Sequence, residues 1–364
     1  MHRRSTPLSA IIVRTAASGA ASQCHRLLAR LRLRQPLGLA QAVRVACTAL
    51  VVTVVCATTA TARAAPSVVV TIKPIHSLVS SIMQGVGEPR LLIPGSRSPH
   101  GASLKPRQAA LLQDADLVFW VGPELETFLK NPIQTISKRA RILALLQADP
   151  QYPPLLNRDA DDFSYNQLAT ADDGNKTAHD HDHSHSHSHS HSQADPHFWL
   201  DPIRAASISQ IIANELINVD AANATTYRAN ATALGIRLTA LNRRISNELQ
   251  DVQQEKLLVF HDAYQYLEKR FGLQIIGTIT VNPEVPASAK HVQRVFDALN
   301  QQQVACVFSE PQFSTSNLTT ALLARASVKL TVLDPLGASL TPGPTHYEQM
   351  LQAMADAIVS CVKS

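Results

Sequence analysis

Residues 221–250 read AANATTYRANATALGIRLTALNRRISNELQ, and this unbroken stretch decides the fold. It contains no proline and one glycine, Gly235. Apolar residues recur along it at helical spacing: Leu234, Ile236, Leu238, Leu241, Ile245 and Leu249. The pattern predicts a single helix of about 30 residues, which would be about 45 Å long. That length suits a rigid strut between two parts of a protein better than one element of a packed core.

Runs of β-branched and apolar residues lie on both sides of this helix, as expected for strands. Those before it occupy residues 67–72, 90–93, 116–121 and 141–145, and those after it occupy 256–260, 274–278, 304–309 and 329–333. Helices are expected between them, at 74–84, 105–113, 202–217, 263–271, 287–302, 314–326 and 345–362. The alternation predicts parallel sheets with crossover helices.

We therefore expect an α/β chain of two βα lobes, each built on a parallel four-stranded sheet. The predicted boundaries are 65–219 for the N-terminal lobe, 220–252 for the rigid connecting helix and 253–364 for the C-terminal lobe. Asp201 followed by Pro202 predicts the start of the helix that precedes the long one, because an aspartate cap and a first-turn proline are typical there.

Residues 1–64 have the features of an export leader. They contain nine arginines, no lysine and no acidic residue, and they include an uncharged apolar run from Val45 to Thr59. That run is shorter than the about 20 residues that a membrane-spanning helix needs. Ala62-Arg63-Ala64 offers a small-x-small cleavage site, so we expect cleavage after Ala64. A retained anchor is the alternative.

Removing the leader changes the charge of the protein. The whole chain has 33 basic and 28 acidic residues. Without the nine arginines, 24 basic residues oppose 28 acidic ones, a net charge of −4. No excess of positive charge then remains to attract nucleic acid, so we expect no nucleic-acid partner.

Three of the five cysteines lie in the leader, which leaves Cys306 and Cys361 in the mature chain. Two cysteines in an exported protein most simply form a disulfide. Closing that loop would stabilise the protein by about 4 kcal/mol in the chain-entropy model. Two free buried thiols are the alternative.

Residues 149–196 are polar, with almost no aliphatic residue after Leu168. Such a segment cannot bury enough apolar surface to order itself, so a disordered loop is expected, with its histidine-rich part at about 170–194. Alternating imidazoles bind borderline metals such as Zn²⁺ and Ni²⁺ without a defined geometry. We expect an accessory metal-binding tract formed by His179, His181, His183, His185, His187, His189 and His191.

Four other residues could form an ordered metal site. His100 and His261 follow predicted strands, as does Asp334, and His197 precedes the helix that begins near Pro202. The carboxyl ends of parallel strands are where α/β sheets bind ligands. Each residue alone is weak support, but three neutral imidazoles and a carboxylate suit tetrahedral Zn²⁺.

These segments together resemble the periplasmic zinc-binding proteins of high-affinity zinc ABC transporters, the ZnuA type, within the wider family of metal-binding solute receptors. The resemblance runs from about Val68 to Val362. The segments that carry it are the His-rich loop and the motifs SPHGASLKP, ADLVFWVGPELE, DPHFWLDP, FHDAY, TVNPE, CVFSEPQF and LDPLG.

The resemblance implies two βα lobes joined by one long helix, with the metal in the cleft between the lobes. It also implies that His100, His197 and His261 are the ligands, and that Asp334 stands where family members carry an aspartate that can complete the site. Related manganese receptors tend to have a glutamate in place of His261, so the imidazole favours zinc. Cys306 and Cys361 match the positions of a disulfide in this group, and Pro99 stands where some members have an acidic residue.

The expected function is that of a monomeric periplasmic protein, not an enzyme, which captures Zn²⁺ and delivers it to the membrane permease of an ABC transporter. A zinc hydrolase is one alternative, since catalytic zinc also uses three protein ligands, although the chain lacks HExxH. A metal-binding surface adhesin of the same fold is another. Two further histidines, His291 and His346, fall in predicted helices, where we expect them on the solvated surface; His76 is left open as a contributor.

Overall fold

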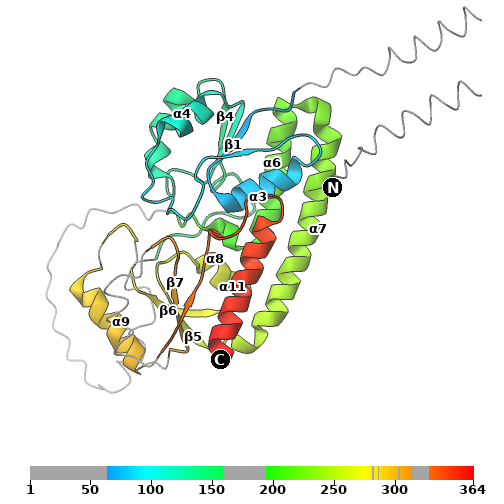
Figure 1. Cartoon of the computed structure of the whole chain (residues 1–364). Helices are drawn as coiled ribbons and strands as arrows, with labels where there is room; N and C mark the ends of the chain where they lie inside the picture. Colours follow the sequence, from blue (N-terminus) through cyan, green and yellow to red (C-terminus); the bar gives the residue numbers. More distant parts are fainter. Residues whose placement is uncertain (1–63, 159–193, 281–282, 286, 302–303, 314–327) are drawn as a thin grey trace, which may run out of the picture. The chain divides into compact units, whose positions relative to one another are not determined.

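The computed structural model describes residues 64–364 except 159–193, 281–282, 286, 302–303 and 314–327 (Figure 1). The chain divides into two units, Met1–Ala64 and Ala65–Ser364, and the described residues belong almost wholly to the second. The predicted leader, the histidine-rich tract and the helix expected at 314–326 therefore lie outside the described residues. Within the described part, no helix is long and apolar enough to cross a membrane.

Two parallel four-stranded sheets confirm the predicted α/β architecture. The N-terminal sheet has the order β2-β1-β3-β4, formed by β1 (Val68–Val70), β2 (Arg90–Leu91), β3 (Leu117–Trp120) and β4 (Arg141–Ala144). The C-terminal sheet repeats that topology in the order β6-β5-β7-β8, formed by β5 (Lys256–Val259), β6 (Gln274–Thr278), β7 (Cys306–Ser309) and β8 (Lys329–Val332).

Helices connect the strands, and most begin close to the predicted residues. They are α3 (Lys73–Ile82), α4 (Pro106–Gln113), η1 (Thr127–Leu129), α5 (Pro132–Ile136), η3 (Phe198–Leu200), α6 (Pro202–Val219), α8 (Gln265–Phe271), α9 (Ala289–Gln301) and α11 (His346–Lys363). The predicted start of α6 is confirmed, because the Asp201 carboxylate accepts hydrogen bonds from the backbone N–H groups of Ile203 and Arg204.

The long helix is α7 (Ala224–Leu249), with the short helices η4 (Ala221–Asn223) before it and η5 (Gln250–Val252) after it. Its 26 residues give a length of about 39 Å. It packs along α6, α3 and α11 (Figure 1), so it is part of the core and does not stand free. One face is buried, at intervals of three or four residues, through Tyr227, Ala231, Leu234, Leu238, Leu241, Ile245 and Leu249.

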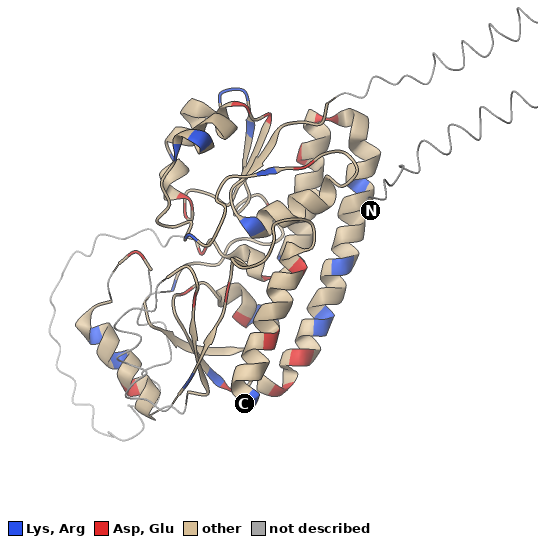
Figure 2. Cartoon of the chain, viewed as in Figure 1, with Lys and Arg blue, Asp and Glu red and all other residues tan. Residues whose placement is uncertain are grey.

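Buried apolar residues of both sheets and of α7 form one continuous cluster. Polar contacts join α7 to α11 outside this cluster, including the ion pair of Arg237 with Glu348 and the hydrogen bond from Arg244 to Gln352. Figure 2 shows charged residues along both helices. The predicted disulfide is present: Cys306, at the start of β7, is joined to Cys361 in α11.

Candidate metal centre

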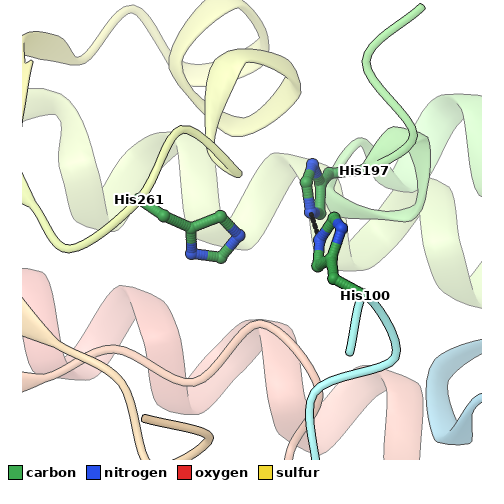
Figure 3. Close-up of side chains that lie close together, drawn as sticks. All are labelled: His100, His197 and His261. Atoms are coloured by element: carbon green, nitrogen blue, oxygen red, sulfur yellow. Dashed lines mark hydrogen bonds between the residues drawn. The ribbon is translucent and has the colours of Figure 1, made fainter. Parts of the chain in front are cut away.

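Three histidines from separate parts of the chain meet at one point (Figure 3). His100 lies in the loop between β2 and α4, and His197 immediately precedes η3. His261 follows β5, an inner strand of the C-terminal sheet, so the carboxyl end of that strand delivers its side chain. One nitrogen from each imidazole lies within 4.8 Å of the other two.

The ring nitrogens that face one another can be identified from the hydrogen bonds. His100 Nε2 and His197 Nε2 are 3.2 Å apart, the contact drawn in Figure 3. His261 Nε2 is buried and has no hydrogen-bond partner among the described residues. Ring centroids are 5.3 Å apart for His197 and His261, and 5.7 Å apart for His100 and His261. A buried imidazole nitrogen without a partner, beside two others, fits a metal ion that would occupy the space between them.

Two buried carboxylates fix the outer nitrogens of these rings. His197 Nδ1 lies 2.8 Å from Asp195 Oδ1, and His261 Nδ1 lies 2.7 Å from Glu310 Oε1. Asp195 Oδ1 also accepts the backbone N–H of His197 at 3.0 Å, while Glu310 directly follows β7, the strand beside β5. A carboxylate on Nδ1 holds the proton there and leaves the Nε2 lone pair for the metal, as is usual for histidine ligands.

The local electrostatics separate the three histidines. Burial lowers the pKa of His100 and that of His197 well below the ordinary value, and neighbouring histidines lower each further. Burial also lowers the pKa of His261, but the charge and hydrogen bond of Glu310, together with the charges of Asp262 and Asp195, outweigh it, so the net pKa of His261 is raised. Burial raises the pKa of Asp195 to about 7. In the metal-free protein, His261 is therefore the ligand that carries a proton most readily.

The space between the histidines is small. The cavity has a volume of about 10 Å³, the size of one water molecule or ion. Besides the histidines, its walls include Trp199, Phe313 and Gln312, and Glu310 is the acidic residue among them. The cavity has room for an ion, and the carboxylate in its wall already contacts His261 through one oxygen.

Asp334, predicted to complete the site, is not brought together with the histidines. Its Oδ1 accepts hydrogen bonds from Gln312 Nε2 at 2.7 Å and from the backbone of Leu336 at 3.1 Å, and its Oδ2 accepts from Ala338. It lines a different cavity, beside Gly337. An aspartate that accepts backbone N–H groups of the following residues organises its own turn.

The remaining histidines of the described chain contact backbone oxygens, and two of them correct the sequence prediction. His291 and His346 are buried, not solvated: their Nε2 atoms contact the backbone oxygens of Thr278 at 2.8 Å and Gly337 at 3.1 Å. His76 is also buried and contacts Pro89 O at 3.1 Å. The accessory tract at 179–191 lies outside the described residues.

Sequence reasoning missed Asp195 as a partner of a histidine. The only signal was its position two residues before His197, in Asp-Pro-His. For Glu310 the signal in the sequence is its position directly after a predicted strand, and the structure places that strand beside the one that precedes His261.

Comparison with known proteins gives consistent matches over the same part of the chain. A family model described as "Zinc-uptake complex component A periplasmic" (ZnuA) matches residues 68–361. The high-affinity zinc uptake system protein ZnuA of Brucella abortus is 39% identical over 306 residues, which cover 81% of this chain and 91% of that protein. Its counterpart in Yersinia pestis is 32% identical over 300 residues, covering 82% and 92%.

Solved structures agree with the sequence comparison. A crystal structure of ZnuA superimposes with a TM-score of 0.65 at 25% identity and covers 82% of this chain and 99% of that one. A ZnuA variant that lacks residues 138–173 of its own chain and has zinc bound gives the same TM-score and identity, with 98% of its chain covered. A laminin-binding adhesin of Streptococcus agalactiae, at 20% identity and a TM-score of 0.65, shares the fold.

Proposed function

The chain belongs to the ZnuA family of periplasmic zinc-uptake components, and from this premise we propose that His100, His197 and His261 hold the Zn²⁺ that it carries. The protein is a zinc-binding solute receptor of an ABC transport system and not an enzyme. The observation that carries the proposal is the convergence of three imidazole nitrogens within 4.8 Å, two of the rings being oriented by buried carboxylates.

The chemistry of the donors supports zinc. Neutral imidazoles suit Zn²⁺, and a three-histidine set leaves one position for a fourth ligand. That position belongs to Asp334 or to solvent. Since the Asp334 carboxylate accepts backbone and Gln312 hydrogen bonds, it would have to exchange these contacts for the metal. Asp334→Asn, which removes the charge, distinguishes the two: only a direct ligand gives a large loss of zinc affinity.

Metal analysis and competitive zinc titration of the mature protein test the site. Intact protein, a deletion of 174–193 and His261→Ala are compared, with His291→Gln as a control outside the cluster. We expect one tight site that survives the deletion and the control, and that is lost or greatly weakened in His261→Ala. Loss of tight binding in the deletion, with His261→Ala unaffected, would place the site in the histidine-rich tract and contradict the proposal.

The proposal also covers the export of the protein and the delivery of its zinc. We infer that the leader is cleaved after Ala64, that the mature protein is a monomer, and that it passes zinc to the membrane permease of its transporter. Mass spectrometry of the exported protein tests the cleavage, and light scattering tests the monomer. A strain without this gene should grow poorly when zinc is chelated; rescue by wild type but not by His261→Ala supports delivery, and equal rescue by both contradicts it.

A further inference from the structure

Two short stretches that are far apart along the chain hold each other next to the metal site. Leu156 and Ala194 form an isolated antiparallel bridge, and the Asp195 N–H donates to Leu155 O at 2.7 Å. Asp195 is also the carboxylate that contacts His197 Nδ1. The bridge between 155–156 and 194–195 therefore supports one of the three histidines.

Helix α8, in the C-terminal lobe, holds the same bridge. The Tyr266 hydroxyl accepts the Leu155 N–H and donates to Asp195 O, both at 2.9 Å. Gln265 Nε2 donates to Leu156 O at 3.1 Å. The bridge thus lies between the loop of His197 and the segment that follows His261.

Arg158 connects the bridge to the His261 loop. Its Nε donates to both carboxylate oxygens of Asp262, at 3.2 and 3.1 Å, and another guanidinium nitrogen donates to Glu268 at 2.7 Å. The two partners in the Asp262 pair are 18% and 6% exposed. Because Asp262 directly follows His261 in the chain, a guanidinium fork that fixes this carboxylate also restrains the backbone of His261.

We propose that Arg158 is a positioning residue of the metal site, which sets the separation of the His261 and His197 imidazoles by fastening Asp262 to the bridge that carries Asp195. This inference rests on the proposed role of the three histidines. A positioning role of Arg158 and a purely electrostatic role predict opposite effects of its removal on zinc affinity. Removing a positive charge near a cation site strengthens its attraction for zinc, whereas releasing the His261 loop weakens binding.

The test compares Arg158→Gln and Arg158→Lys with the full mature protein by competitive zinc titration and by the visible absorption of bound Co²⁺, which reports coordination geometry. We expect Arg158→Gln to bind zinc about tenfold more weakly, in the range seen for residues that orient metal ligands, and to give an altered Co²⁺ spectrum. Arg158→Lys keeps the charge but cannot form the fork, so it should stay several-fold weaker than wild type. Arg237→Gln, which breaks the α7–α11 pair with Glu348, should behave as wild type.

Wild-type or tighter zinc binding with an unchanged Co²⁺ spectrum in Arg158→Gln would overturn the inference. If Arg158→Gln does not fold, Arg158→Lys decides alone, and a wild-type affinity and spectrum there would overturn it equally. A failure of the proposed function would give a different result. In that case the unsubstituted protein would lack a tight zinc site that His261→Ala removes.

Discussion

Glu310 illustrates how much a single residue outside the histidine set can contribute. Its carboxylate contacts His261 Nδ1 at 2.7 Å and is itself buried. Glu310→Gln keeps the size of the side chain but removes the charge that orients and activates the imidazole. We expect zinc affinity to fall by about 10- to 100-fold, measured by competition with a chelator. Glu348→Gln on α11 is the control, and equal affinities in the two variants would contradict the assigned role.

The three pKa directions predict how zinc binding responds to acid. His100 and His197 have lowered pKa values and stay neutral, whereas the raised pKa of His261 makes it the protonated ligand. The His261–Glu310 contact stabilises the metal-free fold below the unfolded-state pKa of histidine, about 6.5. That contribution is lost as the pH rises through the raised pKa, and zinc must displace the same proton.

We therefore expect the dissociation constant for zinc to rise about tenfold per pH unit below the pKa of His261, the slope of one proton. As the pH is lowered, the dissociation constant should already begin to rise above about pH 6.5, because the pKa of His261 is raised. Zinc titrations across a pH series measure the slope. Glu310→Gln should move the onset to lower pH, because it removes the main cause of the raised pKa. A slope of two or three protons would show that groups besides His261 also titrate, among them Asp195, whose pKa burial raises to about 7.

For single residues, the limits of sequence-based prediction have physical causes. His100 and His261 could be singled out because each follows a parallel strand, and the carboxyl ends of such strands are where α/β sheets bind ligands. The role of Asp195 could not be predicted, since it depends on side-chain rotamers in an irregular segment. Asp334 was expected beside the histidines by the resemblance, but the sequence does not reveal that the N–H groups of Leu336 and Ala338 occupy its oxygens.

Among the elements, β7 carries the disulfide at one end and a site residue at the other. Cys306 begins the strand and Glu310 follows its carboxyl end. Replacing Cys306 and Cys361 together by alanine opens a link between residues 55 positions apart, which should cost about 4 kcal/mol in the chain-entropy model. Denaturant unfolding measures the loss, and zinc affinity of the folded variant should be unchanged. Weaker zinc binding in a fully folded variant would contradict this separation.

Helix α7 contains Gly235 in its interior, where glycine is unfavourable. A Cβ there would meet Gln210 Nε2 at 3.9 Å, an ordinary contact. Gly235→Ala should stabilise the protein by about 0.5–1 kcal/mol, measured by urea unfolding. Gly337→Ala is the contrast: its φ is +59° and its Cβ would lie 2.7 Å from His346, so it should destabilise by about 1–3 kcal/mol. Equal effects of the two substitutions would contradict these local arguments.

The elements themselves were the most predictable part of the structure. β-branched runs and the long helical pattern are local signals, and the sheets and α7 follow them. Burial of His291 and His346 was not predictable, because their partners, the backbone oxygens of Thr278 and Gly337, come from outside their own helices. The packing of α7 against α3 and α11 is non-local for the same reason.

Over the whole of Ala65–Ser364, the histidines join parts of the chain that belong to different sheets. His100 follows a strand of the N-terminal sheet and His261 one of the C-terminal sheet. Zinc should therefore stabilise both lobes at once, by about 4 kcal/mol at a free concentration 1,000 times its dissociation constant. Calorimetry should show one transition that moves to higher temperature with zinc and does not move in His261→Ala. Two transitions, of which zinc shifts one, would contradict the coupling.

The packing of helix α7 has a consequence for how the protein would dock at the membrane. Because it packs against α3 and α11 within one continuous core, a large rotation of one lobe against the other would break that packing. Loaded and empty protein would then present almost the same outline to the proposed permease. We expect the empty form to compete for the docking site, so that zinc uptake would decline when the receptor is overproduced without enough metal to fill it.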